Sequence, residues 1–253
     1  MSVSSIKTII IISILFSFLN VYPQSGFRSE QKKFSRVRNA YNEKEKQLKS
    51  LVEDKGIEYF NADIFLRVFK QEKTIEVWIK GHDKNKFILL TDYKFCSTSG
   101  TPGPKRKQGD LQIPEGCYYI DRFNPYSNFH LSLGISYPNR SDKILGNKTN
   151  PGGDIFIHGS CVTIGCIPIT DDKIKELYIL AVEAKNSGQV KIPVFIFPAI
   201  MNDENMSKLR KDYSGNTDII SFWKNLKTVY DHIEKSKNLP EISVNKNGQY
   251  IIK

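Results

Sequence analysis

Short runs of alternating hydrophobic and polar residues fill the middle of the chain, and turn residues separate them. The segments that this alternation, or a short apolar run, predicts as strands are residues 64–69, 74–79, 87–95, 117–120, 130–138, 154–158 and 191–198. The first two are joined only by Lys70–Lys73, which predicts a β-hairpin. The middle of the chain is therefore expected to be rich in β-structure.

Helical periodicity appears at both ends of this region and once inside it. Residues 29–55 are highly charged, with apolar side chains at helical spacing, and predict an amphipathic helix. Residues 170–188 begin with a threonine and two aspartates, which suit a helix N-terminus, and end on a glycine. Residues 219–233 carry one apolar stripe, with Thr217 as the expected N-cap. Such a stripe is typical of a helix that packs on the main domain.

The first residues have the pattern of an export signal. Lys7 precedes an apolar stretch, Ile9–Leu19, which has the length of a signal-peptide core and is short for a membrane span. Small and polar residues follow, so cleavage near Gln24 is expected. An uncleaved anchor is the alternative. The protein is predicted to be exported, to a periplasm or another part of the cell envelope.

The charge of the chain is strongly positive. Lysine and arginine number 37 against 27 acidic residues, a net charge of +10, and losing Lys7 with the leader leaves about +9. A basic exported protein is attracted to anionic wall polymers or lipid headgroups. The lysines form no long run, so no nucleic-acid partner is predicted, and any membrane contact is expected to be peripheral.

Four cysteines in an oxidising compartment allow three pairings of two disulfides. A nucleophilic cysteine must stay unpaired, so only one bridge is compatible with catalysis by Cys166; Cys96 with Cys161 is the pair that we favour. His158, Cys161 and Cys166 do not have the usual spacing of zinc ligands, and no second ligand cluster is evident. No metal site is predicted.

A histidine and a cysteine eight residues apart are the main candidates for catalysis. His158 ends an apolar run, Cys166 lies on a turn after Gly165, and the loop between them can bring the two side chains together. A thiol attacks carbonyls as the thiolate, so it needs a base within hydrogen-bond reach. Gly165 leaves room for a substrate backbone and for N–H groups that face an oxyanion. The alternative is a buried cysteine without a chemical role.

Several segments around this pair match one family of enzymes. His158-Gly159 is followed by a loop and then by Thr163-Ile164-Gly165-Cys166, a histidine and a [Ser/Thr]-x-Gly-Cys signature. The segments that match upstream of the signature are Gly103–Ile120, Asn124–Asn139 and Gly152–Asp154. Together they resemble the L,D-transpeptidase (YkuD-type) family, and specifically its YafK-like branch, over about residues 60–200.

The resemblance implies an α+β fold with a mostly β catalytic domain, sandwich-like or barrel-like, flanked by N- and C-terminal helices. With the patterns above, it divides the chain into a signal peptide (1–24), an N-terminal charged helix (25–56), an L,D-transpeptidase-like catalytic domain (57–200) and a C-terminal helical extension (201–253).

The resemblance also implies an activity. Such an enzyme is an exported cysteine acyltransferase that acts on peptidoglycan stem peptides through a thioester on Cys166, and it forms cross-links or attaches a protein to the wall. His158 is the expected general base, the carbonyl of Gly159 is expected to orient it, and the N–H groups of Gly165 and Cys166 are expected to stabilise the oxyanion. No cofactor is expected.

Four further residues are candidates for substrate binding. Lys105 and Arg106 are paired cations that suit stem-peptide carboxylates, the alternative being a solvated loop without a binding role. Ser160 and Thr163 lie in the loop between the histidine and the cysteine, and are expected to contact the substrate.

The chain departs from the family at two positions. Ile164 stands where many members have a second histidine, and Ile167-Pro168-Ile169 stands where many have an arginine. The branch includes an enzyme that cuts a peptidoglycan–protein link. Alternative functions are therefore a murein hydrolase or amidase that detaches a wall-linked protein or a D-amino acid, and a non-catalytic wall-binding module. A structural domain in which Cys161 and Cys166 are both bridged is a further alternative.

Overall fold

The computed structural model describes residues 26–59 and 61–253, and the expected signal peptide, residues 1–24, lies outside the described residues. The elements are, in chain order, α1 (Phe27–Gln31), α2 (Ser35–Glu53), β1 (Ala62–Phe69), β2 (Thr74–Gly81), β3 (Ile88–Lys94), β4 (Gly116–Asn124), β5 (Ser132–Ile135), α3 (Arg140–Leu145), β6 (Phe156–His158), β7 (Ile167–Pro168), α4 (Thr170–Asn186), β8 (Pro193–Phe197), α5 (Asp203–Asp212), α6 (Thr217–Ser236), β9 (Ile242–Val244) and β10 (Tyr250–Ile252). Within the described ranges, no helix combines the length and the apolar character that a membrane span needs.

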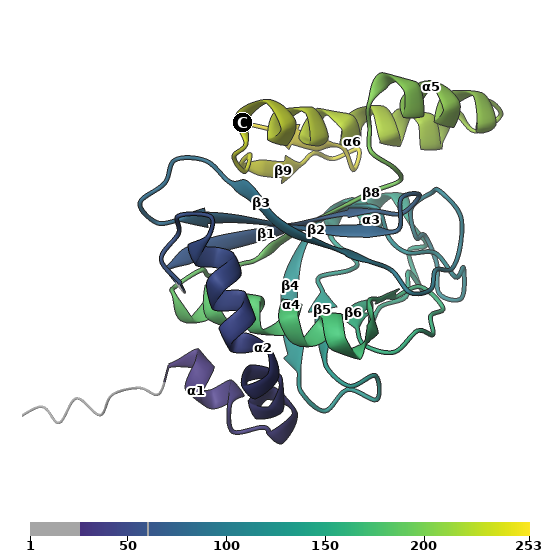
Figure 1. The fold of residues 1–253 in the computed structure, drawn as a ribbon. Helices are drawn as coiled ribbons and strands as arrows, with labels where there is room; N and C mark the ends of the chain where they lie inside the picture. Colours follow the sequence, from purple (N-terminus) through teal and green to yellow (C-terminus); the bar gives the residue numbers. More distant parts are fainter. Residues whose placement is uncertain (1–25, 60) are drawn as a thin grey trace, which may run out of the picture.

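Eight strands form one sheet in the order β3-β2-β1-β8-β4-β5-β6-β7 (Figure 1). β1 and β2 form the predicted antiparallel hairpin, and β8 lies parallel to β1. β4 pairs through Gly116–Tyr119 with β8 and through Ile120–Asn124 with β5. The sheet therefore curls around β4, and its far end carries the short strands β6 and β7. This arrangement confirms the predicted α+β fold with a mostly β central domain.

Both faces of β1 are buried, which explains why this strand is apolar almost throughout. Leu66 and Val68 belong to a core on the face that α2 and α4 cover, while Phe65 and Phe69 point to a second core on the opposite face. Adjacent residues of a strand point to opposite faces, so the alternation supplies both cores from one segment. The helix predicted at residues 170–188 is α4, which lies beneath the sheet in Figure 1.

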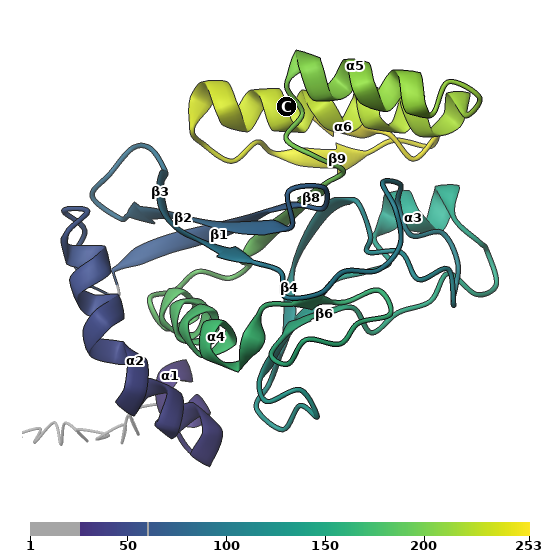
Figure 2. The same cartoon turned by 45° about the vertical axis from the view of Figure 1, so that its right-hand side comes forward.

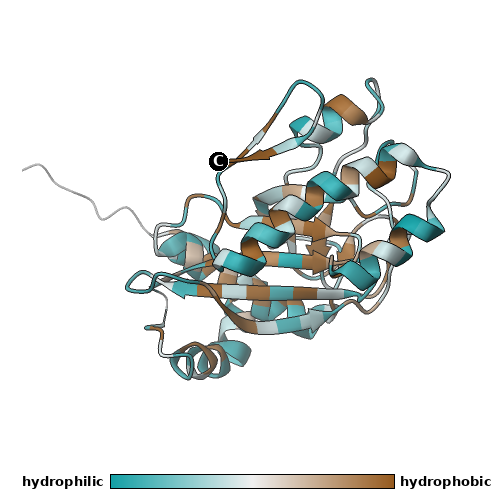
Figure 3. Ribbon diagram, turned by 90° about the horizontal axis from the view of Figure 1, so that it is seen from above, coloured by the Kyte–Doolittle hydropathy of each residue, from teal (hydrophilic) through white to brown (hydrophobic). Residues whose placement is uncertain are grey.

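The C-terminal extension covers the second face as a separate layer (Figure 2). Trp223 and Leu226 of α6 are fully buried against aromatic residues of the sheet, as the apolar stripe predicts. Figure 3, which looks down on this layer, shows hydrophobic and hydrophilic residues interleaved along its helices. The extension is not entirely helical, because β9 and β10 pair as an antiparallel hairpin. Its layer packs on the central domain and shares a core with it.

Three local predictions need correction. The N-terminal helical segment is two helices, α1 and α2, because the chain turns between Lys32 and Phe34. The N-cap of α6 is Asn216, whose side chain accepts from the N–H of Ile219, and Thr217 is the first helical residue. The strand predicted at residues 130–138 is only four residues long, since the chain leaves the sheet before the helix α3.

Candidate active site

Cys166 and His158 lie at the curled end of the sheet. His158 is the last residue of β6, and Cys166 directly precedes β7, which is parallel to β6 with Ile157 opposite Ile167 and His158 opposite Pro168. One position earlier in this register, Cys166 lies opposite Phe156. Because side chains alternate along strands, the thiol and the imidazole project from the same face as diagonal neighbours. The loop between them returns the chain to the neighbouring strand.

The ring of His158 is held by its own backbone and by an aromatic neighbour. Its Nδ1 lies 2.5 Å from the carbonyl oxygen of Gly159, a geometry in which Nδ1–H donates and Nε2 is left as the basic nitrogen. The ring of Phe129 stacks on it, with 4.6 Å between the ring centroids. His158 is only 1% exposed, and burial lowers its pKa, an effect that the Gly159 carbonyl opposes. The imidazole is therefore neutral at neutral pH, the state that a general base requires.

Gly159 has no room for a side chain. A Cβ at this position would lie 2.8 Å from the carbonyl oxygen of Phe129 and 3.1 Å from Cγ2 of Ile174. The backbone of Gly159, which holds the His158 ring, is therefore packed closely against the backbone of Phe129, whose ring stacks on the imidazole.

The thiol of Cys166 is half-buried and unpaired. Its Sγ donates to the carbonyl oxygen of Asp154 at 3.7 Å. Burial, and to a smaller extent the charge of Asp154, raises the pKa of Cys166, while the backbone N–H of Phe156 and the charge of Lys105 act in the opposite direction. Burial thus favours the neutral thiol of Cys166 and the neutral imidazole of His158, so a nucleophilic role for Cys166 would require a base to take the thiol proton.

The turn before Cys166 is closed by the hydroxyl of Thr163. This hydroxyl accepts from the N–H of Gly165 at 3.1 Å and donates to the carbonyl of Cys166 at 2.8 Å. Gly165 has φ +135°, and a Cβ there would lie 3.1 Å from the carbonyl oxygen of Gln112. Its N–H is engaged within the turn, which corrects the expectation that it faces an oxyanion. The side chain of Thr163 stabilises the turn, whereas the sequence led us to expect that it contacts the substrate.

The loop after His158 is anchored from two sides. Cys161 forms a disulfide with Cys96, which follows β3, and their Cα atoms are 5.3 Å apart. This confirms the pairing that we favoured and excludes a bridge between Cys161 and Cys166. Ser160 has φ +61°, and its N–H donates to Asp171 Oδ1 at 2.7 Å in the first turn of α4. Ser160 is thus held as part of the loop frame, and Asp171 is an anchor that the sequence suggested only as a helix-start residue.

Cys117 is the other unpaired cysteine among the described residues, and it is a poorer candidate for a nucleophile than Cys166. Cys117 lies on β4, and burial raises its pKa far above the ordinary range. In the part of the chain that the structure describes, no three potential histidine, cysteine or carboxylate ligands come together to hold a metal ion.

Lys105 and Arg106 do not form the paired cation site that the sequence suggests. Lys105 is 4% exposed, and its Nζ contacts Asp110 Oδ1 at 2.7 Å, so a solvated loop is also wrong for this residue. Arg106 turns to the other side of the loop, where its guanidinium lies 4.9 Å from the ring centroid of Phe222. Lys105 is thus held within its own loop by Asp110, while Arg106 contacts Asp142 at 3.4 Å and Phe222 of the C-terminal extension.

Sequence reasoning missed Phe129 and Gln112, both of which contact the signature residues from distant segments. Nothing in their local pattern signals these contacts, since each arises only when the sheet curls.

Comparison with known proteins identifies the family. The YkuD family, described as the L,D-transpeptidase catalytic domain, matches residues 63–196. The chain belongs to this family. It is 36% identical over 193 residues to the Escherichia coli K12 protein named "Putative L,D-transpeptidase YafK", covering 76% of this chain and 74% of the relative. The same figures hold for the protein of that name from Escherichia coli O157:H7. Both the family and the YafK-like branch predicted from the motifs are confirmed.

Two solved structures are also similar to this chain. The helical cell shape determining protein Pgp2 from Campylobacter jejuni is 19% identical, covers 74% of each chain and has a TM-score of 0.43. Bd1075 from Bdellovibrio bacteriovorus is 20% identical, covers 70% of this chain and 61% of that chain, and has a TM-score of 0.38.

Proposed function

We propose that the protein is a cysteine L,D-transpeptidase that acts on peptidoglycan stem peptides in the cell envelope. The observation that carries this proposal is the placement of Cys166 and His158 on one face of two neighbouring parallel strands, with the histidine Nδ1 tied to the Gly159 carbonyl. Membership of the L,D-transpeptidase family supplies the reaction class. The positive charge of the chain suits an anionic wall.

The first half of the reaction forms a thioester. Cys166 Sγ attacks the carbonyl carbon that joins the L-centre of a diamino acid to the terminal D-alanine, and His158 Nε2 takes the thiol proton. The tetrahedral intermediate collapses, its C–N bond breaks, and the D-alanine amine leaves with the proton that His158 returns. The stem is then held as an acyl group on sulfur.

The second half transfers this acyl group. An amine of another stem peptide, or of a protein destined for the wall, attacks the thioester and loses its proton to His158. The C–S bond breaks, a new amide forms, and the thiolate regains a proton. The N–H of Cys166 is the oxyanion donor in both halves, and one such donor contributes roughly 3 kcal/mol to transition-state stabilisation.

The nucleophile is tested by intact-protein mass spectrometry with a stem tetrapeptide. The wild-type chain is expected to gain the mass of the tripeptide acyl group that remains after D-alanine leaves. Cys166→Ala is expected to gain no mass while remaining folded. Cys117→Ala is the matched control, because Cys117 is the other unpaired cysteine among the described residues, and it should acylate like the wild type. An adduct that persists in Cys166→Ala and disappears in Cys117→Ala would refute the assignment. Carbapenems are expected to label the same residue.

The direction of transfer is tested by digesting isolated sacculi after incubation with the protein. New cross-links, or protein joined to stems, are the expected products of a transpeptidase. Released proteins or freed D-amino acids without new amide bonds would assign the chain to hydrolysis, in which water resolves the same thioester. Sedimentation with sacculi without any thiol reactivity would show a wall-binding module.

A further inference from the structure

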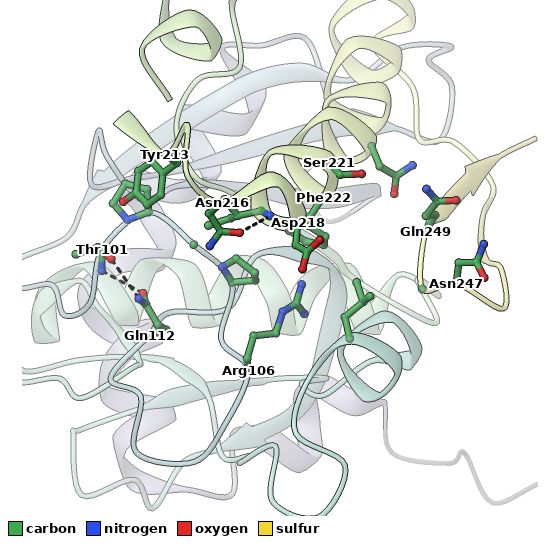
Figure 4. A pocket seen from close by; sticks show the side chains of 17 residues that line it. Thr101, Arg106, Gln112, Tyr213, Asn216, Asp218, Ser221, Phe222, Asn247 and Gln249 are labelled. Carbon is green, nitrogen blue, oxygen red and sulfur yellow. Dashed lines mark hydrogen bonds between the residues drawn. The ribbon is translucent and has the colours of Figure 1, made fainter. Parts of the chain in front are cut away.

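A cavity that the mechanism above does not use lies between residues 100–112, the Gly/Pro loop, and the C-terminal extension. Its volume is about 700 Å³, and side chains from the loop, from α6 and from the turn between β9 and β10 line it (Figure 4). A volume of this size is in the range of small-ligand sites, which span roughly 300–1,000 Å³. The catalytic domain and the extension each supply part of the wall.

One buried carboxylate fixes the two walls of this cavity relative to each other. Glu115, which is fully buried, accepts from the N–H of Gly103 at 2.6 Å and from Trp223 Nε1 at 2.7 Å. Lys70 Nζ pairs with the same carboxylate at 2.9 Å and also donates to the carbonyl of Gly103 at 2.6 Å. A Cβ at Gly103 would lie 3.1 Å from the side chain of Ile219, so the loop runs close against α6. The cavity is therefore pre-formed.

The chemistry of the lining is neutral and rich in groups that both donate and accept hydrogen bonds. The amide and hydroxyl side chains are those of Thr101, Gln112, Tyr213, Asn216, Ser221, Asn225, Asn247 and Gln249. One cation, Arg106, and one anion, Asp218, also line it, and Arg106 is paired with Asp142 Oδ1 at 3.4 Å outside the lining. Arg106 and Asp218 both point into the hollow in Figure 4. Among the described residues, no ion pair or hydrogen-bond donor engages the carboxylate of Asp218, so it can accept from a ligand.

These groups suit an N-acetylated sugar better than a peptide end. Two carboxylate oxygens accept from neighbouring hydroxyls, amides match an acetamido group, and a guanidinium donates to its carbonyl. A stem peptide with several carboxylates would require an excess of cations, which this lining does not have. The apolar face of a sugar ring can rest on Phe222 and Ile219, which form the inner wall.

The Gly/Pro loop separates this cavity from the catalytic turn and contacts both. The side chain of Gln112 bonds to Thr101 on the cavity side, while its carbonyl oxygen lies against Gly165 on the other. The adjacent side chains of Lys105 and Arg106 also diverge, because Lys105 pairs with Asp110 at 2.7 Å within the loop while Arg106 lines the cavity. Three extended stem residues span at most about 10 Å, so a sugar that carries the stem must bind near the thiol.

We propose that this cavity binds the N-acetylated sugar to which the stem peptide is attached, so that the protein recognises glycan and stem together. This rests on the proposed function, which supplies the substrate.

The inference is tested by calorimetry in a Cys166→Ala background, which prevents turnover. The two probes are a disaccharide-tetrapeptide and the same tetrapeptide without sugar. Asp218→Asn and Ser221→Ala are each expected to weaken binding of the disaccharide-tetrapeptide about fivefold and to leave binding of the bare tetrapeptide unchanged.

The matched control is Asp203→Asn. Asp203 lies in the first turn of α5, which Asn202 caps as Asn216 caps α6, but it does not line the cavity. In the Cys166→Ala background, Asp203→Asn should bind both probes with the same affinity as the Cys166→Ala parent. Equal effects of Asp203→Asn and Asp218→Asn, or equal weakening of both probes by Asp218→Asn, would overturn the inference.

A second measurement separates this inference from the proposed function. Acylation of Cys166 by the bare tetrapeptide is expected to be the same in the wild type and in Asp218→Asn. Acylation without any contribution of the sugar to binding would refute the cavity assignment alone. Sugar-dependent binding without acylation by either probe would refute the catalytic proposal and leave the cavity assignment standing.

Discussion

The N–H of Gly165 donates to the hydroxyl of Thr163 at 3.1 Å, and this hydrogen bond shapes the turn that carries Cys166, the proposed nucleophile. The same hydroxyl donates to the carbonyl of Cys166, so one side-chain oxygen closes the turn from both ends. The signature threonine therefore positions the thiol through the backbone.

Removing this hydroxyl is expected to slow acylation without unfolding the protein. Thr163→Val keeps the size of the side chain but loses both hydrogen bonds, and we expect acylation of Cys166 to fall about tenfold as the turn loosens. Thr163→Ser retains the hydroxyl and should keep most of the rate. The measurement is the acylation rate by mass spectrometry, with thermal unfolding as the check on folding. Equal loss in the valine and serine variants would contradict this role.

The sequence predicted the residues of this turn but not its hydrogen bonds. The spacing of Thr163, Gly165 and Cys166 identified the signature, and from it we expected the Gly165 N–H to face the substrate. The donor is engaged because the threonine side chain folds back over two residues, a local choice that competes with the exposed conformation. A motif names the residue types and leaves this choice undecided.

The pH dependence of acylation should reflect a histidine with a lowered pKa. His158 acts as a base only when unprotonated, and burial lowers its pKa below the ordinary value of 6.5. As pH falls, the rate is lost only when the ring becomes protonated, so the acid limb should have its midpoint below 6.5. Acylation rates measured between about pH 4.5 and 8 test this, and a midpoint above 6.5 would contradict it.

Replacing Phe129 should shift the acid limb of the pH–rate profile. Its ring stacks on the imidazole and contributes to the burial that lowers the pKa. Phe129→Ala admits water to His158, stabilises the protonated ring and should raise its pKa, so the acid limb moves to higher pH. Phe129→Tyr keeps the stacked ring and should leave the limb unchanged. A limb that does not move in the alanine variant would show that other groups cause the shift.

Long-range contacts were the least predictable part of the site. Three pairings of four cysteines were open, and the observed one depends on the end of β3 lying beside the loop after His158. Even within one loop, the burial of Lys105 depends on Asp110, five residues away, a pairing that the charge pattern did not reveal. The strands and helices were predictable because hydrophobic periodicity is local and repeated. The packing between distant loops is neither.

The disulfide between Cys96 and Cys161 should contribute to stability as well as to the loop. It joins residues 65 apart, and a closed loop of this length is expected to stabilise the folded state by about 4 kcal/mol. Cys96→Ser/Cys161→Ser should lower the free energy of unfolding by that order in urea titrations. The denatured wild type should show two free thiols without reductant. A count of zero or four would contradict the observed pairing.

The buried pair of Lys70 and Glu115 should be the most sensitive point of the contact between the domain and its extension. Burial lowers the pKa of Lys70, and Glu115 opposes this by pairing with the ammonium. Glu115→Gln leaves a buried charge without its counter-ion, which is expected to cost about 3–5 kcal/mol of unfolding free energy. Trp223→Phe removes the hydrogen bond to that carboxylate and also leaves space at a fully buried side chain, so it should cost at least about 1–3 kcal/mol.

The double variant Lys70→Met/Glu115→Gln distinguishes a charge effect from simple loss of packing. With the ammonium gone, the glutamine no longer leaves an unpaired charge, so the double variant is expected to be more stable than Glu115→Gln alone. Urea denaturation of the wild type, Lys70→Met, Glu115→Gln and the double variant measures the coupling free energy between the two residues. If the two substitutions add without coupling, the ion pair does not stabilise this junction, and the hydrogen bonds of Glu115 to Gly103 and Trp223 must hold the extension in place.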